Sequence, residues 1–306
     1  MRLLFLILLL ALAPLAAQQP PGPGYASDAR CRICHPDKSD SFTRNAHFKI
    51  VVSPKPVENT FGCESCHGPG EAHAEKADIT KINRVGGRPA GQVLDTCLGC
   101  HSKDFPRSNI RRSAHSTHDV ACTNCHSIHG STASKYLLAR TQQRDLCYSC
   151  HRDIRAQFEM PFRHRVNEGA IQCTDCHNPH GSFNPTWRGA LRPRLAADSF
   201  GNDQSCVRCH TDKRGPFVYE HAPVRLDGCE TCHTPHGSTN ARLLKRPAMF
   251  TLCLECHKGV AGFGKTGFGD PAPVTSFHRL EQPQFQNCTT CHARIHGSNV
   301  DRRFQR

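Results

Sequence analysis

The longest apolar run of the chain lies at its N-terminus. Leu3 to Leu12 form an uninterrupted hydrophobic stretch, and small residues follow at positions 13–17. A bilayer-spanning helix needs about 20 consecutive apolar residues, roughly twice the length of this run. The pattern therefore predicts a secretory signal peptide at residues 1–17, followed by a flexible segment at 18–30. We expect an exported chain that crosses no membrane as a helix.

Beyond this segment the apolar positions follow neither a clear helical nor a clear strand period. The pattern predicts mostly loops rich in glycine and proline with short α-helices, one of them around Ser149 to Phe158, and negligible β structure. Hydrophobic residues make up 37% of the chain. Without the cysteines and the N-terminal segment, ordinary apolar side chains fall to about a quarter of the mature chain, against a usual 45–50%. Such a chain either stays disordered or packs around something other than its own side chains.

The net charge of +13 is the next guide to function. A basic balance suits nucleic acid or an anionic membrane. Here, however, the basic residues are scattered along the chain and form no stripe interleaved with aromatic residues. We therefore expect no nucleic-acid partner.

The cysteines carry the strongest pattern. All twenty fall in ten Cys-x-x-Cys-His motifs. Two intervening residues let one turn of chain present both thiols to the two vinyl groups of a haem, and the adjoining histidine then reaches the iron. The expected haem-attaching cysteines are Cys31, Cys34, Cys63, Cys66, Cys97, Cys100, Cys122, Cys125, Cys147, Cys150, Cys173, Cys176, Cys206, Cys209, Cys229, Cys232, Cys253, Cys256, Cys288 and Cys291. The histidines that complete the motifs are His35, His67, His101, His126, His151, His177, His210, His233, His257 and His292.

Disulfides, zinc sites and a thioredoxin-like site are the competing interpretations of paired cysteines. None of them needs a histidine directly after every second cysteine, and this chain has one in all ten motifs. The sequence therefore predicts ten covalently bound haem c groups (Fe). Their twenty propionates would offset most of the basic charge, and their flat apolar rings would fill the interior.

Eleven further histidines divide the motifs into two kinds. Each even-numbered motif has one histidine before it, here called the leading histidine, and one after it, the trailing histidine; odd-numbered motifs have no close extra histidine. The leading histidines are His47, His115, His164, His221 and His278, and the trailing ones are His73, His129, His180, His236 and His296. Five tandem dihaem units follow, at about 31–73, 97–130, 147–181, 206–237 and 253–297, within a decahaem array at 31–298 that ends in a tail at 299–306.

Two haems need four axial ligands, and each unit holds four suitable histidines. We therefore expect all ten irons to be bis-histidine ligated, a state that leaves no open position for a substrate and favours low potentials. His118 is the surplus histidine. It lies only four residues before Cys122, so His115 is the better ligand and His118 is expected near a propionate or at the surface.

About 29 residues per haem cannot insulate the porphyrins, so neighbouring haems should approach van der Waals contact. A trailing histidine three residues after a motif histidine, such as His180 after His177, is poorly placed to reach the same iron and should serve a neighbouring haem. Tandem units that mainly contact the next unit predict an elongated haem array.

The order of motifs resembles the decahaem periplasmic cytochromes of the MtrA, DmsE and PioA family over nearly the whole mature chain. The stretches that carry the resemblance are Cys206–His210, Lys213–Pro216, Tyr219–Pro223, Cys229–Ser238 and Cys288–Ser298. The family pattern also has a histidine at the position of His115. The resemblance implies a periplasmic conduit associated with the outer membrane, seated in a β-barrel porin, and exchanging electrons with periplasmic and extracellular redox proteins.

The expected function is electron transfer along the array, with no catalytic residue. Two alternatives stay open. One is a multihaem reductase with one open-coordination haem, and the other is a soluble periplasmic electron store.

Overall fold

The computed structural model describes residues 23–51, 62–103, 109–130, 135–181, 205–257, 280 and 282–305. The expected signal peptide therefore lies outside the described residues. The chain divides into two compact units, Met1–His101 with Asp119–Ala139, and Ser102–His118 with Arg140–Arg306. The two units interlace along the sequence, because the segment carrying His115 belongs to the second unit while the motif that follows it belongs to the first.

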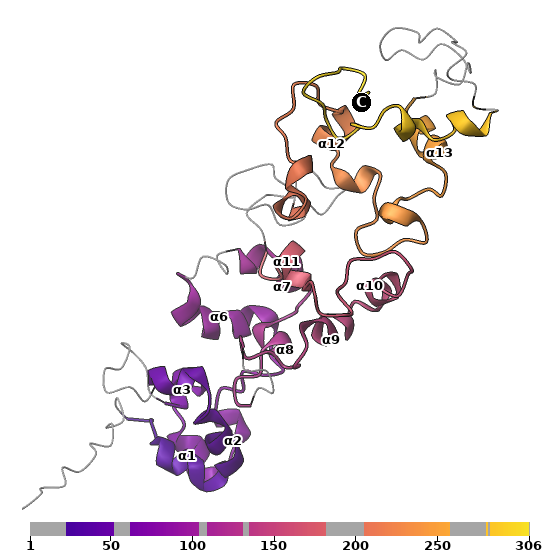
Figure 1. Cartoon of the computed structure of the whole chain (residues 1–306). Coiled ribbons are helices and arrows are strands. Elements are labelled where there is room, and N and C mark those ends of the chain that lie inside the picture. The colour runs from indigo at the N-terminus through magenta and orange to yellow at the C-terminus, as the bar shows by residue number, and fades with distance from the viewer. Residues whose placement is uncertain are drawn as a thin grey trace, which may run out of the picture. The chain divides into compact units, whose positions relative to one another are not determined.

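Short helices separated by long loops make up both units (Figure 1). The first unit contains α1 (Asp28–Cys34), α2 (Pro36–Phe42), α3 (Ala46–Val51), α4 (Glu64–His67), α5 (Glu71–Lys76), η1 (Ile79–Lys81), α6 (Ala90–His101) and α8 (Cys122–Cys125). The second contains η3 (Ile110–Arg112), α7 (Ala114–Thr117), α9 (Gln143–Tyr148), α10 (Arg152–Gln157), α11 (Cys173–Cys176), η5 (Ser205–Arg208), η6 (Thr211–Lys213), α12 (Ala222–Leu226), η7 (Cys229–Thr231), η8 (Ala241–Leu243), α13 (Met249–Leu254), η11 (Pro283–Phe285) and η12 (Cys288–Thr290).

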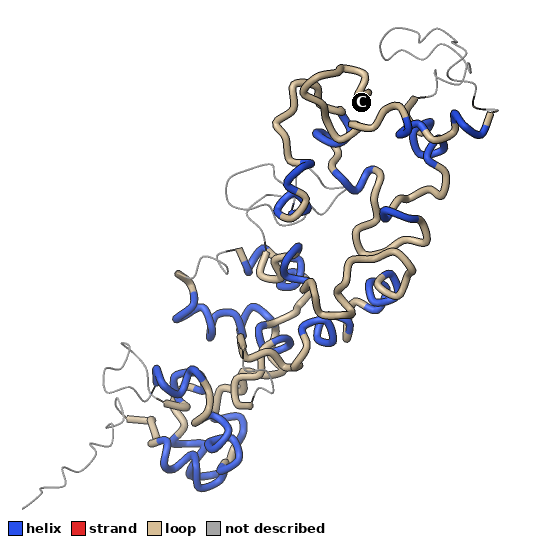
Figure 2. Tube along the Cα trace, viewed as in Figure 1, coloured by secondary structure: helices blue, strands red, loops and turns tan. Residues whose placement is uncertain are grey.

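No strand occurs among the described residues, as the absence of red in Figure 2 shows. Pairing is limited to isolated bridges such as Phe162 with Ser238 and Tyr219 with Ser298. The predicted fold class, mostly loops with short helices and negligible β structure, is confirmed. The elongated array stays a prediction.

The helix expected around Ser149 to Phe158 is shorter than predicted. It breaks at His151, whose φ of −88° and ψ of 64° are not helical, so that α9 ends at Tyr148 and α10 begins at Arg152. The break turns the motif histidine out of the helix. The predicted flexible segment at 18–30 also overlaps an ordered one, because α1 begins at Asp28 and the Ala26 amide donates to Glu64 Oε1 at 2.8 Å.

The apolar core is small in each unit. In the first, Ala90, Val93 and Ala121 are buried together, and α6 also buries Leu94. The Ala90 amide at the start of α6 donates to Asp119 Oδ1 at 2.6 Å, which ties α6 to the segment before α8. The sequence pattern explains this scarcity, since few apolar side chains are left to pack.

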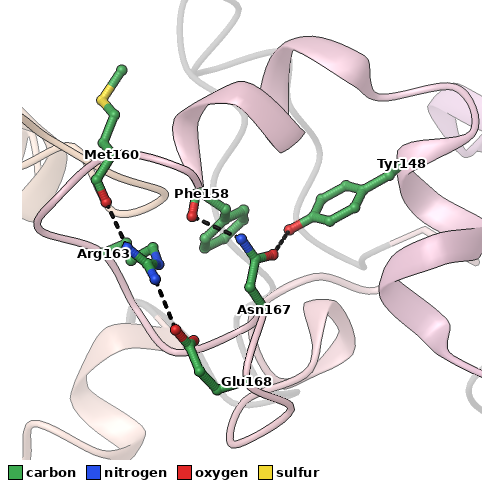
Figure 3. Close-up of polar contacts among 6 residues, drawn as sticks. All are labelled: Tyr148, Phe158, Met160, Arg163, Asn167 and Glu168. Carbon is green, nitrogen blue, oxygen red and sulfur yellow. Dashed lines mark hydrogen bonds and ion pairs between the residues drawn. The ribbon is translucent and has the colours of Figure 1, made fainter.

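The second unit has a comparable cluster of Tyr148, Phe158 and Val166. Polar contacts close the loop after α10 around it (Figure 3): Tyr148 donates to Asn167 Oδ1 at 2.9 Å, and Asn167 donates back to the carbonyl of Phe158 at 2.9 Å. Burial raises the pKa of Tyr148 to about 12, so its hydroxyl keeps the proton that it donates. These contacts fix the conformation of the loop, which carries His164.

A second pair of contacts fixes the same loop at its edge. Arg163 donates to the Met160 carbonyl at 2.9 Å and pairs with Glu168 at 2.8 Å (Figure 3). This ion pair is partly exposed, so its contribution to stability is on the order of 0–1 kcal/mol. Its geometry nevertheless orients the segment that leads into His164.

Truncating the α6 core tests how much the side-chain core contributes. Leu94 is 2% exposed, so Leu94→Ala should lower the free energy of unfolding by about 2–5 kcal/mol through lost burial and a residual cavity. Ile79→Ala in the same unit is the control, since Ile79 is 58% exposed and should change it by no more than about 0.5 kcal/mol. Guanidinium denaturation followed by circular dichroism measures both, and equal midpoints would contradict the assignment of this core.

Candidate functional site

Each Cys-x-x-Cys-His motif forms a single helical turn. In nine of them the histidine amide donates to the carbonyl of the first cysteine at 2.8–3.1 Å, as His151 does to Cys147, and the tenth, His101, ends α6. An i, i+3 spacing on such a turn places both cysteines on one face. In α8 and α11 the residue before the second cysteine caps the turn: Asn124 accepts from the Ala121 amide at 2.7 Å and Asp175 from the Gln172 amide at 2.8 Å.

Every odd-numbered motif histidine faces an imidazole ring from elsewhere in the chain. The ring centroids of these five pairs are 6.0–6.3 Å apart. The pairs are His35 with His73, His101 with His47, His151 with His115, His210 with His164, and His257 with His221. Four of the partners are leading histidines of the even motif just before, and one, His73, is a trailing histidine.

Three even-numbered motif histidines face the trailing histidine of the next even motif. Their centroids are 5.7–6.2 Å apart, in the pairs His67 with His129, His177 with His236, and His233 with His296. The ring opposite His177 is thus His236, 59 positions along the chain, and not His180. The trailing histidines in these pairs lie opposite a motif other than their own.

The spacing of the eight pairs fits one iron atom between the two rings. An imidazole nitrogen binds a first-row metal at about 2.0–2.1 Å and lies about 1.1 Å from its ring centroid, so two such rings on one metal have centroids about 6.3 Å apart. The residues present therefore fit a bis-histidine iron site at each pair.

The remaining predicted ligands lie outside these pairs. His126 and His292 each place Nδ1 against a backbone carbonyl, of Tyr136 at 2.7 Å and of Arg303 at 2.6 Å, and the His180 amide donates to Asn178 Oδ1 at 3.0 Å. His278 lies outside the described residues. The ligand roles of these four histidines stay predictions, as do those of the sixteen histidines in the pairs.

Backbone carbonyls orient many of the rings through Nδ1. Apart from His126 and His292, the contacts at 2.7–3.0 Å are His67 with Asn83, His73 with Asp78, His115 with Pro179, His164 with Pro235, and His233 with Arg242. A carbonyl can only accept, so Nδ1 carries the proton and Nε2 is left free for a metal.

Leading histidines are fastened to the trailing segment of the next repeat. His115 and His164 donate to the carbonyls of Pro179 and Pro235, each directly before a trailing histidine. In the first unit Asn45 takes this part, because its amide donates to the carbonyl of Ile128, and its Oδ1 lies 3.2 Å from Nδ1 of His47. Predicted ligands of neighbouring sites are thus linked by hydrogen bonds, directly in the second unit and through the Asn45 side chain in the first.

Burial keeps several of these imidazoles neutral. It lowers the pKa of His296 to about 4, helped by the nearby Lys213, and is the largest cause of the lowered pKa of His47, His129, His177, His221 and His236. Neutral imidazole is the metal-binding form. The protein therefore favours the ligand state before any metal binds.

The cysteines of consecutive motifs also meet. The first cysteines hydrogen-bond through sulfur within each expected dihaem unit, in the pairs Cys31 with Cys63, Cys97 with Cys122, Cys147 with Cys173, Cys206 with Cys229, and Cys253 with Cys288. Between neighbouring dihaem units, the second cysteine of the later motif helps to raise the pKa of the earlier one in three pairs: Cys66 with Cys100, Cys176 with Cys209, and Cys232 with Cys256. Groups bound at the sulfurs of each pair would be close neighbours.

A metal ion offers another interpretation of one cluster. One ligand atom each of Asp28, Cys31 and Cys63 lies within 4.8 Å of the others. Asp28 already accepts from the Cys63 amide at 2.8 Å, and both cysteines belong to motifs. Asp28 therefore positions a motif and is not needed as a ligand.

Sequence reasoning missed the role of the Gly-Ser that follows a trailing histidine. A side chain on Gly237 would overlap the Gln157 carbonyl, and one on Gly297 would overlap the Phe217 ring. The next residue, Ser238 or Ser298, forms the bridge to Phe162 or Tyr219. The repeated His-Gly-Ser was a visible signal for this close packing.

Comparison with known proteins agrees with this site. The sequence matches the family described as doubled CXXCH motif at residues 115–156 and 221–262, cytochrome c7 and related cytochrome c at 160–234, and cytochrome c554 and c-prime at 70–127. It is 32% identical over 278 residues to multiheme cytochrome MtrA of Shewanella baltica (strain OS185), which covers 88% of this chain and 78% of that protein. The chain belongs to the MtrA family.

Other relatives of this MtrA-family cytochrome match parts of it. Cytochrome c-type protein NrfB of Escherichia coli O6:H1 is 29% identical over 42% of this chain and 67% of its own, and tetraheme c-type cytochrome CymA of Shewanella oneidensis is 27% identical over 43% and 82%. The protein is therefore a multihaem c-type cytochrome with covalently bound haem, and it transfers electrons.

The two histidines before Cys122 in this MtrA-family chain allow a test of which one is the ligand. His115 lies opposite His151, whereas exposed His118 places Nδ1 2.7 Å from the carbonyl of Ala114. His115→Ala should open one iron and add a high-spin signal worth about one-tenth of the haem in electron paramagnetic resonance. His118→Ala is the matched control and should leave the spectrum unchanged. A high-spin signal from His118→Ala alone would reverse the assignment.

Gly237 tests the packing of a trailing histidine. Gly237→Ala would push the chain away from the Gln157 carbonyl and tilt His236, so the low-spin signal of one haem should shift or broaden. Gly91→Ala in α6 meets no atom within 4 Å and should have no such effect. An unchanged spectrum for Gly237→Ala would show that this close approach does not position the ring.

Proposed function

We propose that the protein binds ten haem c groups, each between a motif histidine and a leading or trailing histidine, and carries electrons along them through an outer-membrane porin to or from an extracellular redox partner. The observation that carries the proposal is the set of eight imidazole pairs with centroids 5.7–6.3 Å apart. Eight such pairs, each joining a motif histidine to a leading or trailing histidine, are what bis-histidine sites would require of the residues that the structure describes.

Closed coordination supports a carrier over a reductase. Two imidazole rings that hold one iron between them would leave no site for a substrate oxyanion. When bound, the haem supplies a one-electron change. The chain's own part is to hold each pair of rings at the right spacing and to keep the imidazoles neutral through burial. No catalytic residue is needed for this.

The order of the cysteine contacts supports a path along the motifs. Within each dihaem unit the first cysteines are neighbours, as Cys31 and Cys63 are, and three pairs of second cysteines, such as Cys66 and Cys100, link one dihaem unit to the next. Haems attached at these cysteines would lie next to one another. Electrons entering at one terminal haem would pass in motif order to the other.

Family membership supports the place of action. The apolar N-terminal stretch suits export to the periplasm, with residues 1–17 removed and the dihaem units at 31–298 forming the array. Among the residues described, none of the helices has the length and apolarity that a membrane crossing requires. Association with the outer membrane would then depend on a β-barrel porin, as the resemblance to the decahaem family implies.

Fractionation of the native host tests the conduit. The tagged protein should stay with outer membranes after osmotic shock and co-purify with a β-barrel protein when those membranes are solubilised. Release by osmotic shock alone would contradict the conduit and support a soluble electron store. A wild-type high-spin haem in resonance Raman spectra would contradict closed coordination and support a reductase.

A further inference from the structure

Two ring partners in the described histidine network are side chains and not backbone carbonyls. Nδ1 of His47 lies 3.2 Å from Oδ1 of Asn45, and Nδ1 of His236 lies 3.2 Å from Oε1 of Gln157. A backbone carbonyl is the same in every sequence. A carboxamide, by contrast, is a position at which the sequence can change the partner of the ring.

The Gln157 contact belongs to the pair at the sixth motif. His236 faces His177 with centroids 5.8 Å apart, and the Phe158 ring packs 5.3 Å from His236 on the same site. Gln157 is the last residue of α10 and half-buried. The nitrogen of His236 that Gln157 does not contact is thus the one left to face His177 across the gap.

Close packing fixes this geometry. Gly237 leaves room for the Gln157 backbone carbonyl, which also accepts from the Met160 amide at 3.1 Å. Ser238 and Phe162 exchange amide and carbonyl hydrogen bonds at 2.8 and 3.1 Å. These contacts hold the backbone that follows His236 in place. They therefore keep the imidazole ring beside the amide oxygen of Gln157.

A hydrogen bond at the far nitrogen changes the ligand that the iron senses. An acceptor that takes the Nδ1 proton partly to itself makes the imidazole more basic, and a more basic ligand stabilises ferric over ferrous iron. A carboxylate accepts more strongly than a neutral amide, and a thioether hardly accepts at all. The reduction potential of one haem therefore depends on which residue stands at position 157.

We propose that Gln157 is a positioning residue that sets the reduction potential of the haem held by Cys173, Cys176, His177 and His236. The proposal rests on the proposed function, because it needs an iron between these two rings. Asp153, one turn earlier on α10, also acts electrostatically on His236, so the ring already has a carboxylate nearby. Because the amide of Gln157 is neutral, it lowers the reduction potential of this haem less than a second carboxylate would.

Two substitutions with opposite expected signs test the proposal in the full holoprotein. In spectroelectrochemical titrations each one-electron step reduces one Fe(III) to Fe(II), and one haem gives about one-tenth of the α-band change. Gln157→Glu should move that tenth to lower potential, and Gln157→Met, which keeps the unbranched length, should move it to higher potential. Gln142→Glu adds the same charge at the exposed residue before α9 and should leave the titration as in wild type.

A merely structural role for Gln157 gives a different result. If both variants move the same fraction in one direction, or if both titrate as wild type while all irons are low-spin, the proposal is overturned. If the wild type itself shows a high-spin iron, the proposed closed coordination fails first. The low-spin resonance of one haem should shift in Gln157→Glu and Gln157→Met and stay in place in Gln142→Glu.

Discussion

A pair of imidazole rings from distant parts of the chain, separated by the width of one metal atom, is the contact on which the rest of this protein depends. In the part of the chain that the structure describes, the side-chain cores are small, with three buried residues in each cluster, and the helices are mostly one or two turns long. Isolated helices of that length are not stable in water. Thioether bonds would hold each haem to one turn, and in every observed pair except that of His35 with His73 the second imidazole brings in a segment from another repeat.

Hydrogen bonds decide which segment that is. The loop after α10 is closed by Tyr148 and Asn167 and presents His164, whose Nδ1 reaches the carbonyl just before His236. His164 itself faces His210, whereas His236 faces His177, the histidine of the motif just before that one. The same polar groups therefore orient the rings and join one site to the next, so the order of the sites follows from local backbone geometry.

Much of the site could be predicted from the sequence, because covalent attachment needs a fixed local spacing. The motif turns, the covalent haem and the loop-rich fold all follow from it. The partner of each ring could not be predicted, since His177 lies opposite His236 and not the nearer His180 through contacts of Gly237 and Ser238 that no local pattern encodes. The break at His151 in the helix expected around Ser149 to Phe158 could not be predicted either, because its neighbours carry no glycine or proline to signal it.

The offset between a motif and its trailing partner has a consequence for biogenesis. His67, His177 and His233 each await a ring about sixty residues downstream, so each pairing closes a long loop with its own entropic penalty. A chain emerging N-terminus first presents the motif well before that ring. Each of these three motif histidines would therefore wait for its partner ring, and the pairings would close in order along the chain, each about one repeat after its motif has emerged.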